Sequence, residues 1–302
     1  MTGGGAGGLL VVGDVVTDIV ARHHSPLAPA TDTAARIATL PGGAGANAAC
    51  WAARSGAEDV RVLARVGADE VDTHGRVLRA AGVRPHLVAD PAAPTGTVVC
   101  LVGADGERTF LTDSGAALRL CAADWDGGLL AGIGHLHVSG YLFFADTSRA
   151  TARLAMEAAR ARSIPVSVDP ASAGFIARFG TDRFLAAIAG ADVLLPSHHE
   201  AALLTGRSGP ADAAAELSRR FPLVVSTRGA RGALVAASGA VVARVPARPA
   251  TVVDTTGAGD AFTGAFLAAR LAGHGPVEAA RHGCRIAAEA VTVIGGRPRR
   301  PE

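Results

Sequence analysis

The sequence predicts an α/β fold built on a mainly parallel sheet that is covered by helices. The first observation is size and composition, because 302 residues with 49% hydrophobic and 19% charged side chains suffice for a large buried core. The second is the unbroken apolar run at residues 9–12, which is typical of a strand buried on both faces. The third is the alternation of such runs with Ala- and Leu-rich stretches, which is the pattern of βαβ units.

The candidate strands of this sheet are short apolar runs bounded by turn residues. They cover residues 9–12, 60–66, 135–139, 166–169, 193–195 and 223–226. The candidate helices between them cover residues 47–55, 71–81, 148–162, 182–189 and 212–220. The last part of the chain is helical and apolar, and it predicts long helices at residues 259–271 and 276–293.

Two regions break this alternation. Residues 15–21 continue past the first strand, and residues 96–102 and 108–112 flank an Asp-Gly turn at 104–106. No helix separates these pieces, so we expect a small antiparallel sheet that projects from the main one. Its strands would lie within residues 14–40 and 95–113 and would form a lid over a cleft.

The 29 basic residues are all arginines, because the sequence contains no lysine. A Walker-type phosphate loop, the strand lysine of protein kinases, a pyridoxal phosphate Schiff base and a lysine general base all need an ammonium group. These classes of site are therefore excluded. Glutamine is also absent and Asn47 is the only asparagine, which indicates a coding bias rather than a functional selection.

Charge and hydropathy argue against nucleic acid and membranes as partners. The net charge of +2 gives no general attraction to nucleic acid, and the basic cluster of Arg297, Arg299 and Arg300 is expected to be a solvated tail. Residues 1–8 are interpreted as a flexible leader, since they have neither a basic segment nor a long apolar one. The uncharged stretch at 127–145 is rich in glycine and predicts a turn and a buried strand.

The cysteines are scattered along the chain without a close pair, so neither a zinc site nor a disulfide framework is indicated. They are Cys50, Cys100, Cys121 and Cys284. This distribution fits a reduced compartment, and we expect a cytoplasmic protein.

The most informative segment is Asp-Thr-Thr-Gly-Ala-Gly-Asp at residues 254–260, which leads from a strand-like run at 250–253 into a helix. Backbone N–H groups at a glycine-rich helix start converge on an anion, and the helix dipole adds to the attraction. Asp260 falls in the first helical turn. A carboxylate beside a phosphate pocket suits removal of a proton from an attacking hydroxyl, although a simple helix cap is the structural alternative.

A second glycine turn, at residues 41–49, opens another helix. Gly43, Gly45 and Ala48 match the dinucleotide-binding fingerprint formally, but no clear strand precedes Pro41, so an NAD-dependent oxidoreductase is the weaker alternative. Asn47 is more telling, because its amide can donate and accept hydrogen bonds at once, as a hydroxyl-rich ligand requires. A simple cap could equally have been Ser, Thr or Asp.

Together, these two segments resemble the two sequence patterns of the PfkB carbohydrate kinases, the ribokinase-like family. Asp-Thr-Thr-Gly-Ala-Gly-Asp is nearly diagnostic of that family, and Gly-Gly-x-Gly-Ala-Asn occurs in ribokinases. Residues 13–18, 227–232 and 290–295 resemble its first-strand segment, nucleotide loop and C-terminal end. The resemblance implies a single kinase domain over residues 1–302, with a doubly wound, mainly parallel sheet, helices on both faces and a small β-sheet lid.

The resemblance assigns roles to individual residues of the two motifs. It makes Asp260 the catalytic base, with an anion hole formed by Gly257, Ala258, Gly259 and Asp260 itself. The substrate hydroxyls would be held by Asp18, Gly42, Gly43 and Asn47.

The resemblance also implies sites for ATP and for cations. The ATP site would include Thr227, Gly229, Gly232 and Ser197, and Glu200 would help to place Mg²⁺. A monovalent cation such as K⁺ would be bound by Asp254 and Thr256 with carbonyl groups near Ala290, Val293 and Gly295.

This sequence departs from the family patterns at two positions. Ser197 stands where the Asn-x-x-Glu pattern has asparagine, so the side chain in the expected magnesium network is shorter here. Ala44 stands where ribokinases usually have lysine, so the residue typical of ribokinase specificity is absent.

The implied activity is ATP-dependent phosphorylation of a hydroxymethyl group on a sugar or sugar-like small molecule, by a homodimer. A nucleoside kinase of the same family, of pseudouridine or adenosine type, is the main alternative; it needs an apolar or aromatic platform, for which Phe143, Phe144 and Phe175 are candidates. A catalytically silent sugar-binding relative is a further alternative, against which the intact Asp260 argues.

Other residues are weaker candidates. His135 and His137 share one face of a strand and could bind metal, but packed core histidines are the favoured interpretation. Arg108 and Arg149 are candidates for contact with an anionic substrate, although exposed arginines are the ordinary case.

Overall fold

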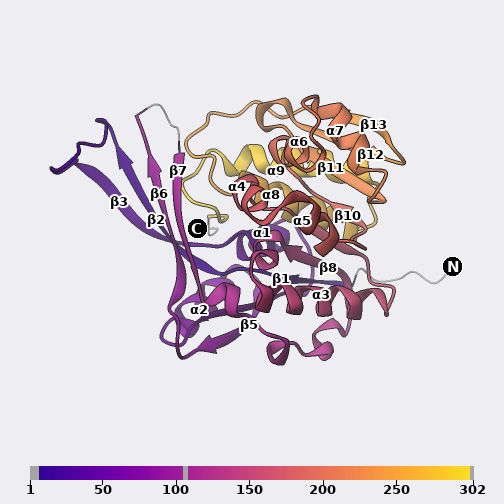
Figure 1. Cartoon of the computed structure of the whole chain (residues 1–302), viewed down its shortest axis with the longest axis horizontal. Coiled ribbons are helices and arrows are strands. Elements are labelled where there is room, and N and C mark those ends of the chain that lie inside the picture. The colour runs from indigo at the N-terminus through magenta and orange to yellow at the C-terminus, as the bar shows by residue number, and fades with distance from the viewer. Residues whose placement is uncertain (1–6, 105–107, 300–302) are drawn as a thin grey trace.

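The computed structural model describes residues 7–104 and 108–299 and confirms the predicted α/β architecture (Figure 1). The described part contains a nine-stranded sheet of order β13-β12-β11-β10-β9-β8-β1-β4-β5. Its strands are β1 (Gly8–Val12), β4 (Val60–Gly67), β5 (Val83–Asp90), β8 (Ile133–Ser139), β9 (Val166–Asp169), β10 (Val193–Leu194), β11 (Leu223–Thr227), β12 (Ala233–Ala237) and β13 (Ala240–Val245). All pairs from β5 to β11 are parallel, whereas β12 pairs in antiparallel fashion with both β11 and β13.

The order of this sheet reverses between β1 and β8. From β1 the chain adds β4 and β5 on one side, and it later adds β8 to β13 on the other. In open α/β sheets, the carboxyl ends of the strands at such a reversal form a crevice that binds ligands. The topology therefore predicts a site beyond Val12 and Ser139, where β1 and β8 end.

Helices cover both faces of the large sheet, and strand β1 shows why. Leu9 and Val11 belong to one hydrophobic cluster, whereas Leu10 and Val12 belong to the other, because successive side chains of a strand point to opposite faces. The first cluster includes residues of α1 (Ala44–Arg54), α2 (Val71–Ala80), α8 (Ala258–Leu271) and α9 (Pro276–Ala290). The second includes residues of α3 (Asp146–Arg160), α4 (Ala173–Phe179), α5 (Thr181–Ala187), α6 (His198–Thr205) and α7 (Pro210–Leu217).

A separate four-stranded sheet extends away from this body (Figure 1). It has the order β3-β2-β6-β7, with β2 (Val16–His23), β3 (Ala35–Gly42), β6 (Thr95–Val102) and β7 (Arg108–Gly115). Its outer pairs are antiparallel as predicted, but the central pair of β2 and β6 is parallel. The expected turn at 104–106 lies mostly outside the described residues, as does most of the expected leader at 1–8.

The fold contradicts two expectations about strands. No clear strand was expected directly before Pro41, but strand β3 continues through Pro41 to Gly42. It is an exposed edge strand of the small sheet and has no continuous apolar run that would identify it. Residues 250–253, expected to be strand-like, form no strand, and Val252 and Val253 are exposed. The uncharged stretch at 127–145 folds into short 3₁₀ turns around β8, and none of the described helices is both long and apolar enough to cross a membrane.

Candidate active site

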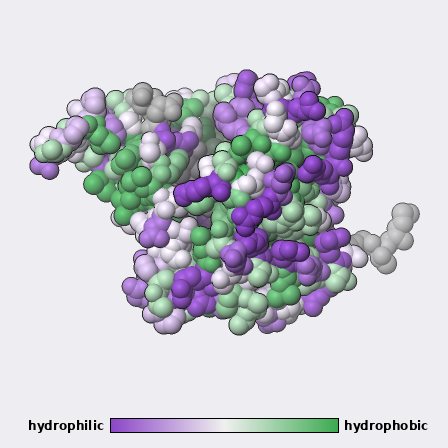
Figure 2. All heavy atoms as spheres, viewed as in Figure 1, coloured by the Kyte–Doolittle hydropathy of each residue, from purple (hydrophilic) through white to green (hydrophobic). Residues whose placement is uncertain are grey.

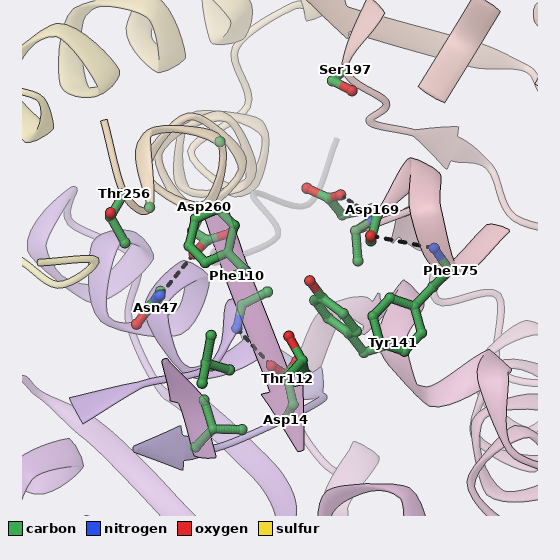
Figure 3. Close-up of a pocket in the computed structure, with 18 of the residues that line it drawn as sticks. Asp14, Asn47, Phe110, Thr112, Tyr141, Asp169, Phe175, Ser197, Thr256 and Asp260 are labelled. Carbon is green, nitrogen blue, oxygen red and sulfur yellow. Dashed lines mark hydrogen bonds between the residues drawn. The ribbon is translucent and has the colours of Figure 1, made fainter. Parts of the chain in front are cut away.

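A cavity of about 720 Å³ opens where the topology predicts it, at the carboxyl ends of the parallel strands. The small sheet closes one side of it, and the starts of α1 and α8 close another (Figure 3). Most of the residues predicted from the sequence to bind or act on substrate line this cavity. They are Asp18, Gly43, Asn47, Ser197, Glu200, Thr227, Thr256, Gly257, Ala258, Gly259 and Asp260.

Asp260 and Asn47 meet although 213 positions separate them in sequence. The Asn47 Nδ2 group donates a hydrogen bond of 2.8 Å to Asp260 Oδ2 (Figure 3). The helices that carry them approach closely at Gly264, where a Cβ atom would lie 2.3 Å from the Ala48 carbonyl oxygen. Burial raises the pKa of Asp260 well above its ordinary value, and the Asn47 donor opposes this effect.

The glycine turn that begins α8 is shaped for a close approach. Gly257 caps the helix with a φ of 71°, and a Cβ atom there would lie 2.4 Å from Gly296 Cα. Nothing lies within 4 Å of the position that a Cβ of Gly259 would take. A helix start has N–H groups without intrahelical acceptors, so this turn offers donors to an anion in the cavity. The Ala258 N–H is already engaged, at 3.3 Å from the Thr255 carbonyl oxygen.

The small sheet and the second glycine turn hold Asp18 against the body. The backbone at Gly42 packs directly on Asp18, since a Cβ atom at Gly42 would lie 2.3 Å from that carboxylate. Gly42 thus supports Asp18 rather than lining the cavity, whereas Gly43 lines it and takes a φ of 98°. Burial raises the pKa of Asp18 to about 6, and the positive charge of Arg297 opposes the increase.

Asp14 is a site residue that the sequence reasoning missed. Its carboxylate accepts hydrogen bonds from the N–H groups of Ala44 (2.8 Å) and Gly45 (3.2 Å) and from Ser139 Oγ (2.7 Å). It therefore joins the ends of β1 and β8 to the start of α1. Its position two residues after a buried strand was the signal that could have identified it.

Asp169 is a second missed residue, at the end of β9. It is placed by Thr263, whose Oγ1 donates to Asp169 Oδ2 over 3.2 Å. Burial, with the nearby charge of Glu200, raises the pKa of Asp169 to about 7. Burial also raises the pKa of Glu200. A partly buried carboxyl group and a buried one thus line the same cavity, where a cation would favour their ionised forms.

The serine in place of asparagine at position 197 has a structural role. Ser197 Oγ accepts a hydrogen bond from the Glu200 N–H, and Glu200 Oε2 accepts one of 2.7 Å from the Ser197 N–H. This reciprocal capping box begins α6 and orients the Glu200 carboxylate. Figure 3 shows Ser197 well apart from the Asn47 and Asp260 pair, at the opposite side of the cavity.

The predicted nucleotide loop lies partly at the cavity and partly behind it. Thr227 lines the cavity at the end of β11, whereas Gly229 and Gly232 do not line it. Gly232 has a φ of 80°, and a Cβ atom there would lie 2.0 Å from the Val245 carbonyl oxygen. Packing against β13 is therefore sufficient to require glycine at this position.

The residues expected to bind a monovalent cation do come together. Asp254 Oδ1 accepts from the Thr256 N–H (2.9 Å), and Asp254 Oδ2 accepts from the Gly295 N–H (3.0 Å). Burial alone would raise the pKa of Asp254, but these donors hold it below its ordinary value. The Ala290 carbonyl accepts a hydrogen bond of 3.3 Å from the Val293 N–H, so both residues belong to the turn that carries Gly295.

The interpretation of Arg297 as part of a solvated tail is wrong. Its Nε donates to Asn47 Oδ1 over 3.2 Å, and its Nη2 donates to the Gly42 carbonyl over 2.7 Å. The chain reaches this position because Trp51 Nε1 holds the Gly296 carbonyl at 2.8 Å. Arg299 is exposed as expected, and Arg300 lies outside the described residues.

Aromatic side chains form one wall of the cavity. Tyr141 and Phe175 line it with their rings edge to face, 5.7 Å apart, and Phe110 approaches from β7 (Figure 3). Of the phenylalanines considered from the sequence, only Phe175 reaches the cavity, because Phe143 is fully buried and Phe144 packs behind Phe175.

The remaining candidates take no part in this cavity, with one exception. His135 and His137 are buried and share Ser167, whose Oγ lies 2.9 Å from a nitrogen of each ring, which confirms the packed-core interpretation. Arg149 is bound to the Phe143 carbonyl, whereas Arg108 lines the cavity and donates to Thr256 Oγ1 over 3.2 Å. Among the described residues, no group of three or more His, Cys, Asp or Glu side chains is arranged to hold a metal ion.

The chain is similar over nearly its whole length to known carbohydrate kinases. A family model described as "pfkB family carbohydrate kinase" matches residues 7–302. A fructokinase from Klebsiella pneumoniae is 34% identical over 282 residues, which are 89% of this chain and 86% of that protein. A ribokinase from Bacillus subtilis is 28% identical over 300 residues, with 97% of each chain covered. A solved structure of a candidate ribokinase II from E. coli with ATP and Mg²⁺ superimposes with a TM-score of 0.84, at 25% identity, over 96% of this chain and 94% of that one.

Proposed function

The chain belongs to the pfkB family of carbohydrate kinases and is an ATP-dependent kinase, and from that premise we propose that it phosphorylates a hydroxymethyl group of a sugar or sugar-like molecule. The observation that carries this proposal is the partly buried carboxylate of Asp260 in the cavity, beside the helix start of α8 with its free N–H donors. Asp18 and Asn47 supply acceptors and a donor for the other hydroxyl groups.

In the proposed reaction, Asp260 accepts the proton of the attacking hydroxyl. The new bond forms between that oxygen and the γ-phosphorus, while the bond to the bridging oxygen of ADP breaks on the opposite side. The Asn47 donor occupies Oδ2 of Asp260, so the other carboxylate oxygen is free for the substrate. Negative charge on the transferring group is stabilised by the N–H groups of Gly259 and Asp260 in the first turn of α8, which have no intrahelical acceptor.

ATP is proposed to lie on the side of the cavity formed by Ser197 and Thr227, with the loop of Gly229 and Gly232 beneath it. Because the chain has no lysine, the phosphates would be bound by backbone N–H groups, arginine and metal. The small sheet would act as a lid that excludes water and so suppresses hydrolysis of ATP.

Mg²⁺ is proposed to be held by Asp169 and Glu200. Both carboxyl groups line the cavity and both have a pKa raised by burial, and the charge of Glu200 further disfavours the ionised form of Asp169, so a divalent cation would stabilise the ionised groups. Oxygen ligands of this type suit Mg²⁺, which in kinases neutralises charge on the phosphates.

A monovalent cation such as K⁺ is proposed to bind beside Asp254 and Thr256. The negative carboxylate and the carbonyl groups of the Ala290–Gly295 turn are suitable oxygen ligands. Its effect would be to order the segment that packs against Gly257 at the anion-binding turn.

Replacement of Asp260 by asparagine tests the central assignment. Asp260→Asn keeps the shape of the side chain but removes the base, so kcat should fall about a hundredfold or more while the affinity for ATP is kept. The measurement is ADP release with a coupled assay, together with ATP binding by calorimetry. A near-normal kcat would overturn the assignment.

A nucleoside kinase is the second candidate, and the aromatic wall favours it. Tyr141, Phe175 and Phe110 offer ring faces and edges on which a base could stack. Screening ADP release with ribose, fructose, ketodeoxygluconate, sugar phosphates, adenosine and pseudouridine distinguishes the two. A Tyr141→Ala variant should lose nucleoside but not sugar turnover if the wall is a base platform.

A homodimer in the cytoplasm is also proposed, with the small sheet as its interface. Ile37 and Leu111 of this sheet are 69% and 58% exposed, and Figure 2 shows hydrophobic side chains gathered on it. Light scattering should give twice the mass of 30.2 kDa. A monomer, or a dimer unaffected by Ile37→Glu, would contradict this interface.

A further inference from the structure

Arg297 lies directly behind the proposed substrate-binding surface, although it does not line the cavity. Its Nε donates to the Asn47 side chain and its Nη2 donates to the backbone carbonyl of Gly42, so one planar guanidinium joins two parts of that surface. Guanidinium groups hold such paired acceptors in a fixed geometry, which a lysine could not reproduce.

The contact with Asn47 decides which end of the amide faces the base. Arg297 Nε lies 3.2 Å from Asn47 Oδ1, and this leaves Nδ2 to donate to Asp260 Oδ2 over 2.8 Å. If the amide were rotated by half a turn, its oxygen would face the carboxylate, and two acceptors would then repel each other. The arginine therefore selects the orientation in which Asn47 stabilises the ionised form of Asp260.

The positive charge of Arg297 also acts on a group of carboxylates that are buried or partly buried in the wall of the cavity. The cavity brings together Asp14, Asp18 and Asp260, and buried charges of one sign are costly unless a partner compensates them. Of the arginines that line the cavity, Arg108 is bound to Thr256 and Arg178 is exposed.

The C-terminal segment is built to hold this arginine in place. Gly296 packs so closely on Asn47 that a Cβ atom would lie 2.4 Å from its Nδ2, and Trp51 fixes the Gly296 carbonyl. Arg297 Nη1 is buried and has no hydrogen-bond partner within residues 7–104 and 108–299. An unpartnered buried donor destabilises a protein, so stability alone does not explain why the guanidinium lies here.

We propose that Arg297 is a positioning residue, which orients the Asn47 amide and so keeps its Nδ2 donor on the catalytic carboxylate of Asp260. This inference rests on the proposed role of Asp260 as the base. It links the C-terminal segment, 250 positions further along the chain, to the substrate turn around Asn47.

The composition of the chain allows the orientation to be observed directly. Asn47 is the only residue with a side-chain carboxamide, because the sequence has no glutamine and no other asparagine. A ¹H–¹⁵N spectrum of the full chain therefore contains a single carboxamide NH₂ pair, well separated in ¹⁵N shift from the arginine guanidinium groups. We expect this pair to shift or broaden in Arg297→Met and to stay in place in the matched control Arg299→Met, whose arginine is exposed. An unchanged pair in Arg297→Met would overturn the proposal.

Kinetics provide the second readout. In Arg297→Met, kcat should fall about tenfold or more while the KM for ATP changes less than about twofold. The acidic limb of kcat/KM should move to higher pH, because Asp260 must be ionised and loss of the oriented Asn47 donor favours its protonated form. The titration of Asp260 is also influenced by the groups around it, which are Asn47, Asp14, Asp18 and Asp169. The groups that titrate close to the Arg297 guanidinium are Cys50 and His74.

A double-variant cycle separates positioning from general destabilisation. If Arg297 acts through Asn47, the Asn47→Ala/Arg297→Met protein should be no slower than Asn47→Ala alone. Independent, multiplying losses would overturn the proposal, as would a kcat loss in Arg297→Met with an unmoved pH profile. If Arg297→Met does not fold, Arg297→Lys replaces it in the cycle. Lysine keeps the positive charge but cannot hold both acceptors, so Arg297→Lys should lower kcat in the natural chain and cause no further loss in the Asn47→Ala background. Failure of the proposed function is distinguishable, since Asp260→Asn would then remain active.

Discussion

Acid should destabilise this protein through one buried cluster, the pair of His135 and His137 on β8. Both rings contact Ser167 Oγ at 2.9 Å, and both are almost inaccessible to solvent. Burial lowers the pKa of each histidine from 6.5 to about 3, and the neighbouring ring contributes for His137. The serine hydroxyl can donate to one neutral ring and accept from the other, so the cluster is satisfied only while both rings are uncharged.

The sign and size of the effect follow from proton linkage. Below pH 6.5 the unfolded chain binds a proton on each histidine, whereas the folded chain does so only near pH 3, so stability falls as the pH falls through 6.5. At pH 5 the loss is about 2 kcal/mol for each ring and about 4 kcal/mol for the pair. Above pH 7 the pair makes no pH-dependent contribution.

Urea unfolding at several pH values, followed by circular dichroism, measures this loss. Buried acids with a raised pKa, such as Asp169, act in the opposite direction, so the comparison must be with a variant that lacks only the histidines. In His135→Leu/His137→Leu, the stability difference from the natural chain should change by about 4 kcal/mol between pH 7.5 and pH 5. Parallel stability curves for the two proteins would refute the reasoning.

Three further predictions concern the active site. Gly257→Ala should cost about 2 kcal/mol or more of stability and lower kcat at least about tenfold, because φ is 71° and the new Cβ would lie 2.4 Å from Gly296 Cα. The control is Gly273→Ala, which has a φ of 90° but open space around it and should keep its kcat. The KM for the acceptor should rise as the pH falls below about 6, since the pKa of Asp18 is raised to that value and its ionised form accepts substrate hydroxyls; a KM that is flat between pH 7.5 and 5 would contradict this. Adding K⁺ to a K⁺-free assay should raise kcat, and Asp254→Asn should remove the increase; equal rates in both proteins at every K⁺ concentration would exclude the cation site.

Much of the fold could be predicted from the chain because its signals are local. The apolar run at residues 9–12 needs two covered faces, and the observed strand β1 contributes to hydrophobic clusters on both sides of the sheet. Strand β3 gave no such signal, because it is an exposed edge strand without an apolar run and is held in place by its pairing with β2. The parallel direction of the pairing between β2 and β6 could not be predicted from local patterns either, since it depends on how two distant segments meet.

The active site divides in the same way. Asp260 and Asn47 could be recognised because each follows a glycine turn at a helix start, a signal contained in fewer than about ten neighbouring residues. Asp14 and Asp169 carry no such signature, because single aspartates after strands become site residues only when those strands lie at the centre of one sheet. Arg297 was assigned to a solvated basic tail because its neighbours are rich in arginine and proline. Such a composition does not reveal that a distant part of the chain packs against the segment.

By itself, the sequence determined the α/β class and the absence of any lysine-dependent phosphate site, and it singled out Asp260 as the candidate base, since each of these depends on residue type or short-range spacing. Only the tertiary structure decided what surrounds that base. The bond from Asn47 to Asp260 spans 213 positions and the bond from Arg297 to Asn47 spans 250. Such contacts depend on where the sheet places its strand ends and on how closely α1 and α8 can pack, and no local pattern encodes either quantity.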